Sequence, residues 1–260
     1  MSPKSGINFR GKGTQVISDT AQSTPSLKVA MLKQIFAEDG VSFERVAYYV
    51  NEYLFPYDIQ HRRILDVGGG DGSIALHIRI CHGATIDILD TYKDYRNAIS
   101  NRKKLLSRIQ RIGLTDVHVI ERDVRTASIK PSTYSYIYTR NCLHHIFGKN
   151  KHTDEDVVRL LNLFHNWLVP GGSLVIGEVG WMLAWRPFSL VRRWLLPGMD
   201  YRSKKSYRYW RHCSERAGFT FKKIYWYVPF RLKKINTLLN NEVANAFLTG
   251  AFVLHVVKNK

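Results

Sequence analysis

Two spacings of apolar residues alternate along the middle of the chain. Short apolar runs with the length of buried strands lie at 64–67, 84–90, 116–123, 134–139 and 173–179. Apolar residues at helical spacing occupy the stretches 73–80, 94–112 and 153–168 between them. Thr153 and the acidic residues after it mark the start of the last of these helices. Strands that alternate with helices predict an α/β fold with a doubly wound, mostly parallel sheet.

Both ends of the chain add elements to this pattern. Residues 1–25 are rich in Gly, Ser and Thr and show little periodicity. Two helical patterns follow at 26–39 and 42–55, with Ser26 and Ser42 as N-caps. Beyond residue 180 we expect a helix at 203–218, and the last strands within 219–230 and 246–258. Pro170-Gly171-Gly172 predicts a turn just before the strand at 173–179.

Composition narrows the class of protein. The chain has 260 residues, of which 45% are hydrophobic and 23% are charged, which is typical of a globular protein with a sizeable core. The three cysteines are far apart, so we expect no disulfide framework, no cysteine-based zinc site and no metal. The N-terminus has no apolar segment of a secretory signal, and no apolar run is long enough to span a membrane. These features predict a cytoplasmic protein.

A glycine cluster follows the first strand. The sequence Asp66-Val67-Gly68-Gly69-Gly70-Asp71-Gly72 stands where a strand turns into a helix, and its glycines let a ligand approach the backbone closely. Gly70 to Ala75 reads as GxGxxA, and Asp90 ends the next strand about 20 residues later, as in dinucleotide-binding proteins. An ordinary tight turn between a strand and a helix would use the same glycines, so this motif alone is not specific.

Three acidic residues separate these possibilities. Asp66 precedes the first glycine by two positions, where a carboxylate suits a cationic amino group and would repel a pyrophosphate. Asp90 ends the second strand, and Asp123 ends the third. The carboxyl ends of parallel strands meet at one edge of the sheet, where open α/β folds bind their ligands. The sequence therefore predicts a ligand that has an amino group and a ribose.

At this point the sequence resembles the class I S-adenosylmethionine-dependent methyltransferases. The resemblance rests on five segments between 61 and about 180, namely ILDVGGGDG, IDILD, VIERDV, YIYTRNCLHHI and LVPGGSLVIGE. It implies a seven-stranded Rossmann-like sheet with an antiparallel C-terminal strand, and S-adenosylmethionine as cofactor. Two alternatives stay open, a non-catalytic binding protein on the same fold and an NAD-dependent oxidoreductase. The (N/D)PP(Y/F) motif of the amino-group methylases of adenine and glutamine is replaced by Arg140-Asn141-Cys142-Leu143, which disfavours that substrate class.

The resemblance also implies roles for single residues in cofactor binding. Asp66 and Gly68 would hold the ammonium and carboxylate of the methionine part, and Gly70 and Gly72 would let the backbone pass close to the cofactor. Asp90 would bind both ribose hydroxyls. The remaining implied contacts are adenine with Asp123 and the Val124 amide, and the methionine part with the backbone of Arg140.

Methyl transfer from a sulfonium is an in-line displacement, so the protein mainly positions the reactants. A base is needed only if the acceptor loses a proton. The candidates are His144 and His145, which follow the fourth strand, and Glu178, which ends the fifth. A histidine suits a hydroxyl acceptor because it titrates near neutral pH. The alternative is that these side chains merely support the loop in which they lie.

The implied organisation has a tail and lid helices at 1–60 and the cofactor-binding domain at 61–260, with a substrate cap inserted at about 181–205. Residues 181–260 hold 16 Lys and Arg against 3 Asp and Glu, and five of the six tryptophans. We expect a small, hydrophobic or lipid-like acceptor under this cap. The basic residues Arg186, Arg192, Arg193, Lys204 and Lys205 also favour peripheral binding to an anionic membrane surface. RNA ranks below both, because no RNA-binding motif is present.

Overall fold

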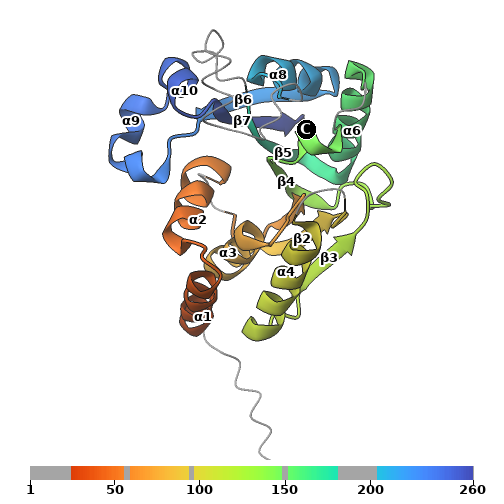
Figure 1. Ribbon diagram of the computed structural model, residues 1–260. Coiled ribbons are helices and arrows are strands. Elements are labelled where there is room, and N and C mark those ends of the chain that lie inside the picture. Colours follow the sequence, from red (N-terminus) through yellow and green to blue (C-terminus); the bar gives the residue numbers. More distant parts are fainter. Residues whose placement is uncertain (1–24, 56–58, 94–96, 148–151, 181–203, 260) are drawn as a thin grey trace, which may run out of the picture.

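A central sheet of seven strands organises the molecule (Figure 1). The computed structural model describes residues 25–55, 59–93, 97–147, 152–180 and 204–259. The strand order is β3-β2-β1-β4-β5-β7-β6. The strands are β1 (Arg63–Val67), β2 (Thr85–Asp90), β3 (Val117–Glu121), β4 (Tyr134–Arg140), β5 (Leu168–Val179), β6 (Phe219–Trp226) and β7 (Ala251–Lys258).

Strand direction sets the place of the site. Strands β1 to β5 pair in parallel, whereas β7 runs antiparallel to both β5 and β6. This arrangement confirms the predicted α/β Rossmann-like sheet with its antiparallel C-terminal strand. Val67, at the end of β1, pairs with Leu89 on one side and Thr139 on the other. The carboxyl ends of the three central strands therefore lie level with one another, as a ligand site on this edge requires.

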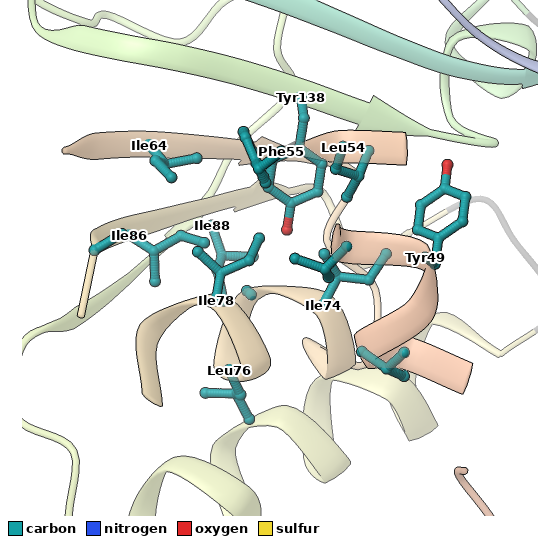
Figure 2. Packing of buried hydrophobic residues seen from close by; sticks show 14 of the residues in the cluster. Tyr49, Leu54, Phe55, Ile64, Ile74, Leu76, Ile78, Ile86, Ile88 and Tyr138 are labelled. Carbon is teal, nitrogen blue, oxygen red and sulfur yellow. The ribbon is translucent and has the colours of Figure 1, made fainter. Parts of the chain in front are cut away.

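Two helical layers cover the sheet. Helices α1 (Pro25–Glu38), α2 (Phe43–Tyr49), α3 (Ser73–His82) and α4 (Ala98–Ile112) contribute buried residues to one core cluster. Helices α6 (Asp154–Trp167) and α8 (Tyr207–Arg216) contribute to a second cluster, together with the short α5 (Leu143–Ile146). Figure 2 shows the first cluster, in which Ile74 and Ile78 of α3 lie under Ile86 and Ile88 of the sheet.

The helix starts follow the predicted caps in two cases. The hydroxyl of Ser42 accepts a hydrogen bond from the backbone N–H of Arg45, which fixes the start of α2. Thr153 and Asp156 form a reciprocal capping box at the start of α6. Helix α2 continues into a π-helical segment, η1 (Val50–Leu54), so the predicted single helix at 42–55 changes its hydrogen-bond pattern at Val50.

Three sequence predictions need correction, and one strand has an irregularity that the sequence did not predict. Ser26, the predicted N-cap of the first helix, lies inside α1, which begins at Pro25. The predicted turn at 170–172 is part of β5, which begins at Leu168 and pairs irregularly with Tyr134 and Tyr136 of β4. Residues 246–248, expected in the last strand, belong to a helix, so β7 begins only at Ala251. Strand β6 ends the sheet, and its register shifts between Phe221 and Lys223, which makes Lys222 the extra residue of a β-bulge.

The connection between β6 and β7 lies at the same edge of the sheet as the glycine loop. It contains η3 (Phe230–Ile235), α9 (Asn236–Leu239) and α10 (Glu242–Leu248). Ala251, the first residue of β7, pairs with Val179, the last residue of β5. The chain between β6 and β7 therefore emerges where the parallel strands end, and Figure 1 shows α9 and α10 above α2.

The division at residue 60 stays a prediction, and most of the expected cap at 181–205 lies outside the described residues, including Trp181, Arg186, Arg192, Arg193 and Trp194. In the part of the chain that the structure describes, no helix is both long and apolar enough to cross a bilayer. Within the same residues, no group of three or more His, Cys, Asp or Glu side chains is arranged to hold a metal ion.

Candidate active site

The glycine loop after β1 is confined by its neighbours. Gly68, Gly70 and Gly72 all have positive φ, between 56° and 76°. A Cβ atom on Gly68 would lie 2.2 Å from Sγ of Cys142, and one on Gly72 would lie 2.3 Å from a methyl carbon of Leu105. Gly70 differs, because the nearest atom to such a Cβ is 3.7 Å away. Both backbone shape and space therefore require glycine at 68 and 72, whereas at Gly70 a Cβ atom would fit and only the positive φ favours glycine.

Asp90 fixes this loop to the end of β2. Its carboxylate accepts hydrogen bonds from the backbone N–H groups of Gly70, at 3.0 Å, and Tyr92, at 2.8 Å. The residue is 7% exposed. The structure thus brings together Asp90 and the glycine loop, which the sequence predicts to share one ligand.

Asp66 is a buried carboxylate at the end of β1. It is 3% exposed, and burial raises its pKa to about 7, with further upward contributions from Asp90 and Asp71. A raised pKa means that negative charge is poorly compensated at this position. A cationic ligand group beside Asp66 would compensate the negative charge of its carboxylate.

Arg108 of α4 secures the other side of the glycine loop. It is 1% exposed and forms ion pairs with Asp39, at 2.8 Å, and Asp71, at 3.1 Å. It also donates hydrogen bonds to the carbonyl of Asp71 and the hydroxyl of Ser73. Burial would raise the pKa of Asp71, but Arg108 and Ser73 hold it below the ordinary value. Arg108 was not predicted from the sequence, although it shares the buried face of its helix with Leu105 and Ile112.

Asp123 lies just beyond the end of β3. Its carboxylate forms an ion pair with Arg125 and accepts a hydrogen bond from the backbone N–H of the same residue. The hydrogen bond from the Arg125 side chain lowers the pKa of Asp123. Val124 is 5% exposed and belongs to the second core cluster. Asp123 is thus charged, but Arg125 already occupies its carboxylate, so an adenine amino group would have to share it.

Arg140 and Tyr49 meet at the ends of β4 and β5. The guanidinium of Arg140 lies 4.5 Å from the ring centroid of Tyr49. A Cβ on Gly177 would lie 2.5 Å from the Tyr49 hydroxyl oxygen, so this hydroxyl rests directly against β5. Burial raises the pKa of Tyr49 to about 12. Figure 2 shows Tyr49 at the end of α2, which places a residue of the predicted lid helices beside the predicted site.

Glu178, His144 and Lys204 form a buried chain of hydrogen bonds. Glu178 Oε2 lies 2.6 Å from His144 Nδ1, and His144 Nε2 lies 2.6 Å from Lys204 Nζ. The other carboxylate oxygen of Glu178 accepts from the backbone N–H of Leu143 at 2.8 Å. The three residues are 2%, 8% and 8% exposed, respectively. A carboxylate acceptor at Nδ1 fixes the tautomer that carries its proton there, which leaves Nε2 as the atom that can take up a proton.

This chain corrects one expectation and adds a residue. Lys204 was expected on a basic surface facing a membrane, but the structure buries it against His144. Its sequence position at the end of the predicted cap gave no sign of this role. The ring centroid of His145 lies 4.0 Å from that of His144. Partial burial, with His144 and Lys204 nearby, lowers the pKa of His145, so it is neutral at physiological pH.

Comparison with known proteins identifies the family. A family model described as a methyltransferase domain matches residues 42–242. The chain belongs to the class I S-adenosylmethionine-dependent methyltransferases. It is thus a methyltransferase and uses S-adenosylmethionine, which decides against the NAD-dependent alternative. A search of the curated proteins finds no match.

Solved structures share the fold at low sequence identity. Phosphoethanolamine N-methyltransferase 2 of Haemonchus contortus, in complex with S-adenosylmethionine, is 17% identical with a TM-score of 0.58; the match covers 93% of this chain and 59% of that one. The chain therefore spans about three fifths of the length of that enzyme. A putative sarcosine dimethylglycine methyltransferase of Galdieria sulphuraria is 12% identical with a TM-score of 0.52, and the match covers 90% and 87% of the two chains. An S-adenosylmethionine-dependent methyltransferase of Methanosarcina mazei is 16% identical, with a TM-score of 0.55 and coverage of 81% and 96%.

The methyltransferase's loop residues fit S-adenosylmethionine. The poorly compensated carboxylate of Asp66 suits the cofactor's ammonium group, and Gly70, which has no side chain, suits a close approach of its backbone to the ligand. Asp90, at the end of β2, lies beside this loop, and its carboxylate accepts the hydrogen bond from the Gly70 N–H. When bound, the cofactor supplies an activated methyl group, and the protein's residues hold and orient it.

Proposed function

We propose that this methyltransferase modifies a small, hydrophobic or lipid-like acceptor that binds over the ends of β4 and β5. The single observation that supports this location is the buried chain Glu178–His144–Lys204, which ends there. Tyr49 lies against β5 nearby and contributes an aromatic wall. The roles of Asp66, Gly68, Gly70, Gly72, Asp90, Asp123, Val124 and Arg140 in cofactor binding belong to the same proposal.

We propose further that His144 takes up, through Lys204, the proton that a hydroxyl acceptor releases. Methyl transfer to a hydroxyl oxygen breaks the S–CH₃ bond, forms an O–CH₃ bond and releases the hydroxyl proton. In our proposal Lys204 takes this proton while passing its own to Nε2 of His144. The resulting imidazolium lies beside the Glu178 carboxylate, 2.6 Å away in the resting structure, which stabilises its charge. His145, the other predicted base, has no carboxylate partner among the described residues and serves in this proposal as a wall of the site.

The acceptor class is tested with labelled cofactor. The protein is incubated with cell extract and S-adenosylmethionine that has a deuterated methyl group, and the extract is then separated into lipid-soluble and water-soluble fractions. We expect mass-shifted products in the lipid-soluble fraction, dependent on the protein and absent with Asp90→Ala. Mass-shifted products found only among water-soluble molecules or RNA would overturn the proposed acceptor class and leave the methyltransferase activity intact.

An anionic membrane surface remains a proposed partner. The sequence places the basic, tryptophan-rich stretch at 181–210 in this role, and most of that stretch lies outside the described residues. Lys204 does not contribute, because it is buried. Lys205 has its ammonium group 4.8 Å from the ring centroid of Tyr209.

A further inference from the structure

The connection between β6 and β7 turns its polar side chains toward the protein. Asn245 is 2% exposed and donates hydrogen bonds to the carbonyls of Tyr227 and Ala251. Asn240 accepts a hydrogen bond from the backbone N–H of Trp226 at 2.8 Å. Asn236 accepts one from the hydroxyl of Tyr53 at 3.0 Å. Three asparagines thus anchor this connection to β6, β7 and η1.

Its aliphatic side chains have the opposite orientation. Ile235 is 44% exposed, Leu238 is 74% exposed and Val243 is 71% exposed. Neither η3 nor α9 contains a buried residue. Within the described part of the chain, seven large hydrophobic side chains are exposed, and four of them lie between Ile235 and Phe247. An exposed apolar cluster of this kind is typical of an interaction surface.

Basic residues precede this cluster in the sequence. Residues 219–250 contain five Lys and Arg, namely Lys222, Lys223, Arg231, Lys233 and Lys234, and a single acidic residue, Glu242. Glu242 lies 3.7 Å from Arg208, which offsets its charge. Arg231, Lys233 and Lys234 are all exposed and directly precede Ile235. We call the residues 230–248 the apolar-basic surface.

We propose that the apolar-basic surface binds an anionic phospholipid membrane. Aliphatic side chains that enter the headgroup region, with lysine and arginine beside them for the lipid phosphates, are what peripheral attachment requires. The net positive charge selects an anionic surface. It also opposes pairing with a second copy of this strongly basic chain, whose formal net charge is +18.

The location of this surface gives the attachment a consequence. The β6–β7 connection emerges at the edge of the sheet where the glycine loop and the Glu178–His144–Lys204 chain lie. A protein attached through it would hold this edge near the membrane. An advantage from holding this edge near the membrane rests on the proposed lipid-like acceptor. Membrane binding itself does not depend on that acceptor.

Co-sedimentation with vesicles tests the proposal without cofactor or acceptor. The full chain is mixed at low salt with vesicles of equal parts phosphatidylserine and phosphatidylcholine, and with vesicles of phosphatidylcholine alone. We expect binding to the mixed vesicles that weakens with added salt, and much weaker binding to the neutral ones. The double substitution Leu238→Asn and Val243→Asn should lower the affinity for mixed vesicles about tenfold or more.

Matched variants at other positions test whether vesicle binding depends on the apolar and basic residues of this surface in particular. Leu27→Asn with Ile99→Asn also replaces two exposed aliphatic residues, at 50% and 69% exposure, and should leave vesicle binding unchanged. Lys233→Glu with Lys234→Glu should abolish the preference for phosphatidylserine, while Lys103→Glu with Lys104→Glu on α4 should change it far less.

Three outcomes would overturn the proposal. One is no binding of the unmodified chain at low salt. Another is full binding by the Leu238→Asn, Val243→Asn variant together with loss of binding by Arg192→Glu, Arg193→Glu, which would assign attachment to residues 181–210. The third is a dimer in light scattering that the Leu238→Asn, Val243→Asn variant dissociates, which would assign the surface to a second copy. Failure of the labelled-cofactor experiment alone would leave vesicle binding standing.

Discussion

The carboxylate of Asp39, just after α1, lies 2.8 Å from the guanidinium of Arg108 in α4. The same guanidinium contacts Asp71 in the glycine loop, so one buried side chain connects the N-terminal helices to this loop. We predict that Arg108→Leu lowers the free energy of unfolding by about 3 kcal/mol, because it leaves Asp71 and Asp39 without their cation. Denaturant unfolding measures this change.

The same helix provides the control. Arg111 pairs with Glu38 at 2.6 Å, but both side chains are more than two fifths exposed. Exposed pairs contribute little, so Arg111→Leu should lower the free energy of unfolding far less than Arg108→Leu does. Equal losses for the two variants would show that Arg108 acts only as a surface charge.

Asp90 offers a direct test of the cofactor site. Asp90→Ala removes a charged acceptor that the ribose hydroxyls would use, and it also frees the Gly70 N–H. We predict at least a roughly tenfold loss of S-adenosylhomocysteine affinity by calorimetry, in a protein that still folds. Asp116→Ala, which removes an acid paired with Arg79 outside the site, should bind like the unmodified protein. Unchanged affinity in folded Asp90→Ala would contradict the assignment.

Asp66 predicts a dependence of cofactor binding on pH. Its pKa is about 7 in the free protein, so the carboxyl group is largely protonated below that pH and cannot hold an ammonium group well. Affinity for S-adenosylhomocysteine should therefore rise as the pH increases toward 7, by up to about tenfold per pH unit, and level off above it. Calorimetry in buffers of different ionisation enthalpy should detect proton release near neutral pH. Asp66→Asn should bind weakly and show no such slope.

Stability of the free protein should follow the opposite course. Because the folded-state pKa of Asp66 lies above the ordinary value of 3.8, folding favours the protonated form. Its contribution is fully present below pH 3.8 and is lost as the pH rises through about 7. Asp66→Asn should therefore be more stable than the unmodified protein at pH 8, by on the order of a few kcal/mol. Equal stability of the two proteins from pH 5 to 8 would contradict the raised pKa.

The chain of Glu178, His144 and Lys204 predicts a specific pattern of turnover. Glu178→Gln keeps an acceptor oxygen but removes the charge that would stabilise an imidazolium. We expect roughly a hundredfold loss of turnover for His144→Ala and a smaller loss for Glu178→Gln, with cofactor affinity retained. The acidic limb of the pH–rate profile should disappear in His144→Ala. His145→Ala tests the other histidine, and a hundredfold loss there instead would move the base to His145.

The sequence predicted the sheet well, because strand and cofactor signals are local. The apolar runs and the glycine cluster depend on neighbouring residues, and the five segments that resemble the family lie in its order. The turn assigned to 170–172 was wrong because Pro and Gly also occur at strand irregularities, as in the pairing of β5 with β4. The strand at 246–258 was too long because 246–248 are as apolar as the strand that follows.

Partners distant in sequence could not be predicted. Lys204 follows His144 by 60 residues, and nothing local distinguishes it from Lys205 beside it. Arg108 left a usable signal, because Leu105, Arg108 and Ile112 share one helical face, yet it is one of several basic residues in this helix and nothing in the sequence singled it out. Tyr49 was expected in a lid helix, but its contact with β5 depends on how α2 packs on the sheet.

The bulge at Lys222 has a consequence for self-association. Strand β6 is the last strand of the sheet, so its outer backbone groups could template the addition of another strand. The register shift between Phe221 and Lys223 interrupts that template, and two adjacent exposed lysines place charge along it. The bulge and the two lysines thus oppose edge-to-edge aggregation on the strand that leads into the surface that we propose contacts lipid. Replacing both lysines by neutral residues would remove this charge, so we expect a concentrated solution of the protein to aggregate sooner.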